Sequence, residues 1–175
     1  FAASLSVYGA SYTRALQLTD ELLSDARENG LYFVVEHALA TRVAALTGLR
    51  TFASAKRTLR DLGLRESAAS TFVRGQTRLR RAGLRVASGD LEGAEVILRA
   101  SSPALYPAAS HGEWMGVRAL LLAARGLVER AREASAEARS TAAYIDAANL
   151  SDLADAIVQP QIGSNSARQF PVQVI

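Results

Sequence analysis

The sequence predicts an all-α fold, a right-handed α-solenoid of tetratricopeptide-like helix-turn-helix repeats. Three observations support this prediction. Apolar residues make up 49% of the 175 positions, alanine and arginine are abundant, and one short pattern recurs along the chain at a nearly constant interval. Alanine and arginine favour helix, and a period of about 20 to 50 residues is typical of solenoids.

The recurring pattern is a bulky apolar residue followed three positions later by alanine. Successive copies are 40, 39 and 37 residues apart, and each follows a turn that contains glycine. Glycine suits the left-handed residue that ends a helix, so each turn predicts a helix on either side. The copies are Tyr12/Ala15, Phe52/Ala55, Leu91/Ala94 and Val128/Ala131, and their turns are Tyr8-Gly9-Ala10, Thr47-Gly48-Leu49, Ser88-Gly89-Asp90 and Arg125-Gly126-Leu127.

Apolar residues spaced three and four apart identify the predicted helices around these turns. Tyr32 and Phe33 are also expected to pack, at the start of the helix before the second turn. The other expected core positions are Val35, Leu39, Val43 and Leu46, then Phe52, Ala55, Leu59 and Leu62, then Leu79, Ala82, Val86, Leu91, Ala94 and Leu98, and finally Trp114, Val117, Leu121 and Ala124.

Capping residues and prolines indicate where these helices begin and end. Asp90 can cap the helix that begins at Leu91, and Ser110 and Glu113 form a Ser-x-x-Glu capping box ahead of Trp114. Pro103 and Pro107 interrupt the pattern, as expected where one hairpin connects to the next.

The predicted packing explains the repeated alanine. One helical hairpin cannot cover its own apolar face, whereas stacked hairpins bury a continuous core. A small side chain is needed where two helix axes cross closely. The repeat domain is expected over residues 1–158, and 159–175, which contains Pro160, Gly163 and Pro171, is expected to be a non-helical linker or docked tail. An irregular helical bundle remains the alternative.

Two stretches resemble a known family. Residues 26–42 (ARENGLYFVVEHALATR) and 48–55 (GLRTFASA) resemble the tetratricopeptide-like region of large LuxR-type, MalT-like bacterial transcriptional regulators, over roughly residues 1–158. In that family an NTPase module precedes the repeats and a helix-turn-helix DNA-binding domain follows them. The resemblance implies a region that senses an inducer or partner. The intervals found here exceed the standard repeat of about 34 residues.

An arginine precedes three of the apolar anchors by ten positions. These are Arg42, Arg81 and Arg118, which stacked repeats would align as a ladder. Facing a concave groove, their guanidinium groups would bind carboxylates or phosphates of a ligand, or an acidic peptide. The alternative is that each arginine pairs with a neighbouring carboxylate.

Charge is distributed unevenly. Residues 50–85 carry ten basic and two acidic side chains, a net charge of +8, although the whole chain has only +3. Because Phe72 is the only nearby aromatic residue besides Phe52, we expect no direct nucleic-acid binding by this chain.

Several functional classes lack their sequence signals. There is no cysteine, no His-Glu-x-x-His pattern, no phosphate-binding loop and no recognition helix, so we expect no metal, no cofactor and no catalysis. His37, His111 and Trp114 are interpreted as structural. No apolar run is long enough to span a membrane, and we expect a cytoplasmic protein.

The chain starts without Met and inside a helical pattern, so we expect it to be a fragment of a longer protein. The sequence does not decide whether the protein forms homo-oligomers. The sequence therefore predicts a sensor or interaction domain of a LuxR-type regulator. The alternative is a tetratricopeptide adaptor that binds a peptide and has no role in transcription.

Overall fold

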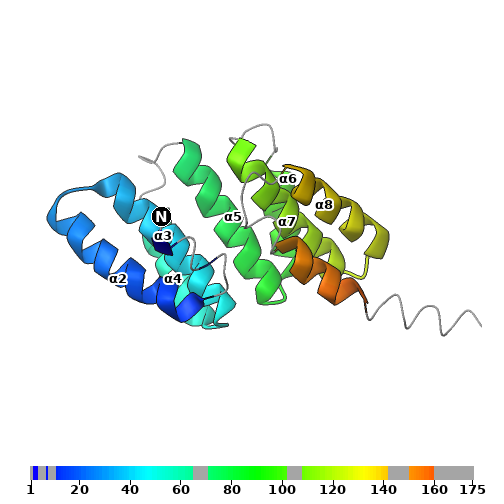
Figure 1. Cartoon of the computed structure of the whole chain (residues 1–175), viewed down its shortest axis with the longest axis horizontal. Coiled ribbons are helices and arrows are strands. Elements are labelled where there is room, and N and C mark those ends of the chain that lie inside the picture. The colour runs from blue at the N-terminus through cyan, green and yellow to red at the C-terminus, as the bar shows by residue number, and fades with distance from the viewer. Residues whose placement is uncertain are drawn as a thin grey trace, which may run out of the picture. The chain divides into compact units, whose positions relative to one another are not determined.

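The computed structural model describes residues 2–3, 7, 11–64, 71–101, 108–141 and 150–159. The regular elements in these ranges are helices (Figure 1), which confirms the predicted all-α class for the described chain. They are α2 (Tyr12–Glu28), α3 (Tyr32–Gly48), α4 (Phe52–Gly63), α5 (Thr71–Ala87), α6 (Leu91–Arg99), α7 (Ala108–Ala124), α8 (Val128–Thr141) and a further helix over 150–159.

The chain divides into two compact units, Phe1–Ser110 and His111–Ile175. In the first unit, α3 contacts α2, α4 and α5, and α5 also contacts α4 and α6. Figure 1 shows α2, α3 and α4, coloured blue to cyan, side by side. The second unit contains most of α7, all of α8 and the helix over 150–159.

The recurring sequence pattern marks the start of every second helix. Its four apolar residues are the first residues of α2, α4, α6 and α8. The alanine three positions later has an exposed fraction of 0% in all four helices, as expected where a neighbouring helix approaches closely. The structure thus confirms one shared register for Ala15, Ala55, Ala94 and Ala131.

Four helix-helix turns share one hydrogen-bond pattern. The N–H groups of Leu31, Thr51, Asp90 and Leu127 donate to carbonyls five residues earlier, at 2.8 to 3.0 Å. The residue before each of these donors has a positive φ, as in a Schellman C-cap. These left-handed residues are Gly30, Arg50, Gly89 and Gly126, with φ of 67°, 57°, 85° and 73°.

The predicted role of glycine is correct at two turns and wrong at a third. Gly89 and Gly126 are left-handed, but Gly48 is the last residue of α3, and Arg50 takes the left-handed position instead. Gly48 has a different reason to lack a side chain, because a Cβ there would overlap the ring of Tyr12. Gly9 lies outside the described residues, and the turn at Gly30 was not part of the predicted pattern.

The apolar core of the first unit includes most of the predicted positions, but Val86 is only half-buried, and Leu23 and Leu84, which were not predicted, belong to it. Its buried cluster includes Val35, Leu39, Val43 and Leu46 of α3 together with Leu59 and Leu62 of α4. The expectation for Tyr32 and Phe33 is wrong, since they are 69% and 59% exposed. They occupy the first turn of α3, whose buried face begins at Val35.

In the second unit, Trp114, Val117 and Leu121 are buried as predicted. The prediction for Ala124 is wrong, because it is exposed at the end of α7 while Ala123 is fully buried.

One predicted cap is confirmed and one is wrong. Asp90 Oδ1 accepts a hydrogen bond from the N–H of Gly93 at 2.9 Å, so Asp90 caps α6. The proposed capping box fails because α7 begins at Ala108, which places Ser110 inside the helix. Pro103, Pro107 and residues 160–175 lie outside the described residues, whereas Gln159, expected to begin the non-helical tail, lies in the helix over 150–159.

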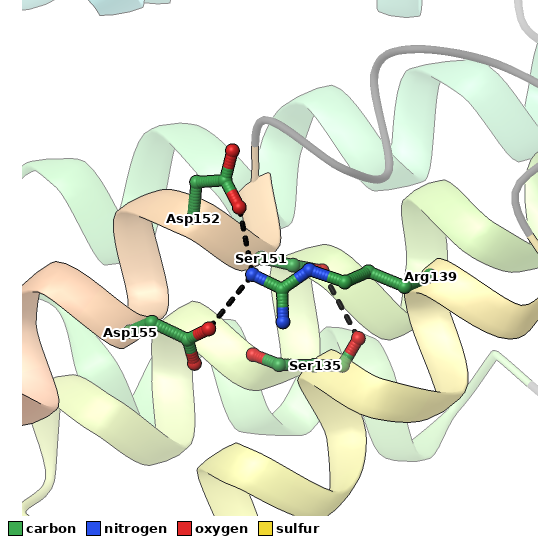
Figure 2. A network of polar contacts seen from close by, with 5 residues as sticks. All are labelled: Ser135, Arg139, Ser151, Asp152 and Asp155. Atoms are coloured by element: carbon green, nitrogen blue, oxygen red, sulfur yellow. Dashed lines mark hydrogen bonds and ion pairs between the residues drawn. The ribbon is translucent and has the colours of Figure 1, made fainter.

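Close packing and an ion-pair network hold the helix over 150–159 within the second unit. A Cβ added to Gly116 of α7 would lie only 2.7 Å from Leu150 Cβ. Figure 2 shows Arg139 of α8, whose Nη2 donates to Asp152 and Asp155 at 2.7 Å each. Ser151 Oγ donates to the carbonyl of Ser135 at 3.3 Å.

Candidate binding groove

A groove with a volume of about 720 Å³ lies in the first unit, between α2, α3 and α4. This volume is within the range typical of ligand sites, about 300 to 1,000 Å³. The residues that line it are Asp20, Leu23, Ser24, Arg27 and Glu28 of α2, Leu39, Arg42 and Leu46 of α3, and Ser54, Arg57, Thr58, Arg60 and Asp61 of α4.

The amphipathic character of α2 and α4 explains the mixed chemistry of the groove. In α2, Asp20, Ser24 and Arg27 follow one another at helical spacing on the exposed face, whereas Leu23 is buried. In α4, Arg57 is exposed beside the buried Thr58. The groove therefore offers buried leucines together with exposed polar groups.

The ion pair between Arg42 of α3 and Asp20 of α2 crosses the groove. The Arg42 side chain is 27% exposed and that of Asp20 is 61% exposed, so the guanidinium group is the more sequestered partner. A guanidinium group has five N–H donors, and the pair with Asp20 engages Nη1. The remaining donors make no other hydrogen bond within the described residues.

Three further arginines of the groove have no ion pair with the described residues. The side chains of Arg27 and Arg60 are exposed and make no polar contact with the described residues, while Arg57 Nη2 donates to Ser54 Oγ at 2.9 Å. Of the carboxylates, Asp61 is unpaired within the same residues, and Glu28 accepts a hydrogen bond from Ser24 at 3.2 Å.

The predicted arginine ladder is distributed over three helices and both units. Arg42 lines the groove, whereas Arg81 lies on α5 with Nη2 3.7 Å from the position that a Cβ on Gly63 would take. Arg118 lies on α7 in the second unit, with its guanidinium carbon 5.6 Å from the Trp114 ring centroid. The ladder as one binding row stays a prediction.

Sequence reasoning missed Arg27, Arg57 and Arg60 as groove residues, and it also missed the carboxylates of Asp20 and Glu28. These carboxylates are exposed on α2 and line the groove. The separation of 22 residues between Asp20 and Arg42 gives no local signal. Only the pairing of α2 with α3 brings them together.

Other ionisable groups lie outside the groove. Burial of His37 lowers its pKa from the ordinary value, and the positive charge of Arg80 lowers it further. His111 Nε2 lies 3.6 Å from Glu137 Oε1, which links α7 to α8.

No group of three or more histidine or carboxylate side chains among the described residues is placed to hold a metal ion. No helix in the described ranges has the length and apolar character needed to cross a membrane.

Comparisons of the chain with protein-family models, curated proteins and solved structures found no match.

Proposed function

We propose that this chain is a non-catalytic interaction domain that binds a protein segment or a small effector in the groove between α2 and α4. The observation that carries the proposal is the combination of about 720 Å³ of accessible space with a leucine floor and charged rims. Ligand sites commonly combine apolar surface with a few polar groups that orient the ligand.

For the fold, we propose a right-handed α-solenoid of tetratricopeptide-like repeats. Three observations support it: the shared register of the four buried alanines, the shared turn geometry, and the contact of α3 with α5 in the first unit. Contacts between helices two apart in sequence are expected when hairpins stack.

For the parent protein, we propose a cytoplasmic LuxR-type, MalT-like regulator, on the resemblance of residues 26–42 and 48–55. We expect the same reading frame to encode a phosphate-binding loop upstream of this chain and a helix-turn-helix domain downstream of it. An adaptor unrelated to transcription would have neither, and its groove would bind a peptide.

The groove is tested by filling it. Ser24 is an exposed groove residue, so Ser24→Trp should occupy the space without disturbing the core. Ser140, an exposed serine on α8, provides the matched control Ser140→Trp. A panel of peptides and metabolites is screened by thermal shift, because a ligand of the native state raises the apparent stability.

The expected result is a ligand that raises the Tm of the wild type and of Ser140→Trp but leaves that of Ser24→Trp unchanged. A panel without any shift, or a shift that survives Ser24→Trp, would mean that this groove is not the binding site.

A further inference from the structure

The exposed face of α4 is basic. Lys56, Arg57 and Arg60 are all exposed, while Ala55 and Leu59 occupy the buried face between them. Arg57 and Arg60 also line the groove, so the rim formed by α4 presents two guanidinium groups to a ligand. On the opposite rim, Arg27 of α2 presents a third.

The surroundings of this rim strengthen its positive potential. Within 50–64 and 71–85, nine basic side chains accompany a single acidic one, Asp61. α4 contacts α5, which carries five of these cations. Charges of one sign on neighbouring helices add, and they raise the local concentration of ligands of the opposite sign.

The floor of the groove is already largely covered by the protein itself. Leu23, Leu39 and Leu46 line it and are only 5%, 4% and 6% exposed. A ligand can remove little further apolar surface from water there, so the charged groups on the two rims decide which ligand binds.

We infer that the partner of this groove is an acidic polypeptide segment. Its carboxylates pair with Arg27, Arg57 and Arg60. Guanidinium groups bind carboxylates through paired, charge-assisted hydrogen bonds. This inference rests on the proposed function and specifies the chemistry of the ligand.

Two features favour a polypeptide over a nucleic acid. The groove is lined by no aromatic residue on which bases could stack, and the nearby Phe52 is half-buried, with the Arg50 guanidinium carbon 5.6 Å from its ring centroid. The groove also contains Glu28 and Asp61, whose carboxylates can accept hydrogen bonds from peptide N–H groups, whereas a phosphodiester backbone has no such donor.

The test measures binding of fluorescent peptides to the whole chain by anisotropy at low ionic strength. One probe repeats the sequence Glu-Leu-Glu-Gly, the second replaces every Glu with Gln, and a single-stranded oligothymidylate of similar length is the third. The variant is Arg57→Gln/Arg60→Gln. Arg130→Gln/Arg132→Gln on α8 removes the same charge from two exposed arginines outside the groove and serves as the control.

The expected result is that the Glu peptide binds and loses about tenfold in affinity with Arg57→Gln/Arg60→Gln, as expected for lost charge-assisted hydrogen bonds, but not with the control. Equal binding of the Gln peptide, abolished by Ser24→Trp, would overturn the acidic partner while retaining the groove. If the oligothymidylate binds more tightly than the Glu peptide and is weakened by Arg57→Gln/Arg60→Gln, the acidic polypeptide would be overturned in favour of a nucleic acid. Binding of neither peptide would overturn the acidic partner, whereas the groove itself is tested separately by the thermal-shift panel with Ser24→Trp.

Discussion

The ring of Tyr12, the first residue of α2, occupies the space that a side chain on Gly48 of α3 would need. Gly48→Ala should therefore overpack this contact and lower the free energy of unfolding by about 1 to 3 kcal/mol. Gly83 within α5 has no atom within 4 Å of an added Cβ, so Gly83→Ala is a matched control. It should be stabilising by up to about 1 kcal/mol, because alanine favours helix. Urea denaturation compares the two, and a neutral Gly48→Ala would contradict the contact.

The four turns give a second prediction, in which two substitutions act in opposite directions. Gly89→Ala puts a side chain at a φ of 85° and should be destabilising by about 1 to 2 kcal/mol. Arg50→Gly removes such a side chain at a φ of 57° but also removes the contact with Phe52, so the gain should be only about 0.5 kcal/mol. Thermal unfolding distinguishes the signs, and a stabilising Gly89→Ala would refute this explanation of the turns.

These two cases show how far the sequence could predict the fold. Spacing alone predicted that the four repeated alanines are buried, because a period near 39 residues places them at the same position in every second helix, but it wrongly predicted burial of Ala124. Spacing could not assign the role of Gly48. A glycine near a helix end can serve a left-handed turn or a close contact, and the choice depends on where Tyr12 lies.

The candidate groove was less predictable. Arg42 was identified from its place in the repeat, but its partner Asp20 comes from another helix. The contribution of Arg27, Arg57 and Arg60 depends on the packing of α2 and α4 against α3, which composition does not encode. Tyr32 and Phe33 show the reverse error, since apolar character suggested burial and the first turn of α3 leaves them exposed.

The fully buried Ala94 of α6 gives a third prediction. Ala94→Phe should overpack the helix crossing and lower the free energy of unfolding by about 1 to 3 kcal/mol or more. Val96 lies on the same helix but is 67% exposed, so Val96→Phe should change stability by less than about 0.5 kcal/mol. The difference between their urea midpoints is the measurement, and equal midpoints would show that the repeated alanine does not lie at a close crossing.

His37 gives a pH-dependent prediction. Its folded-state pKa lies below the ordinary value of 6.5, first because of burial and second because of Arg80. Below pH 6.5 the unfolded chain therefore binds more protons at this site than the folded chain. The contribution of His37 to stability is complete above about pH 6.5 and is lost as the pH falls towards the folded-state pKa.

An NMR titration of the His37 imidazole checks this directly. The wild-type pKa should lie below 6.5, and Arg80→Gln should raise it because a nearby positive charge is removed. A wild-type pKa at or above 6.5 would contradict the burial of this side chain.

The final prediction concerns Arg139, whose hydrogen bonds to Asp152 and Asp155 raise its pKa and attach α8 to the helix over 150–159. That helix buries mainly small side chains, Ser151 and Ala154, along with Val158. Because the Arg139 side chain is 40% exposed, solvent screens the network, and its loss in Arg139→Gln should cost only about 0.5 to 1 kcal/mol.

Hydrogen exchange measures the loss of local stability in the helix over 150–159. The amides of 150–159 should exchange about two- to fivefold faster in Arg139→Gln, since local opening becomes easier by that free energy. High salt should produce part of the same change in the wild type because it screens exposed ion pairs. Arg132→Gln removes an exposed arginine of α8 that has no described ion pair, and it should leave the exchange unchanged. If both variants behave alike, the attachment depends on the small buried side chains rather than on the charges.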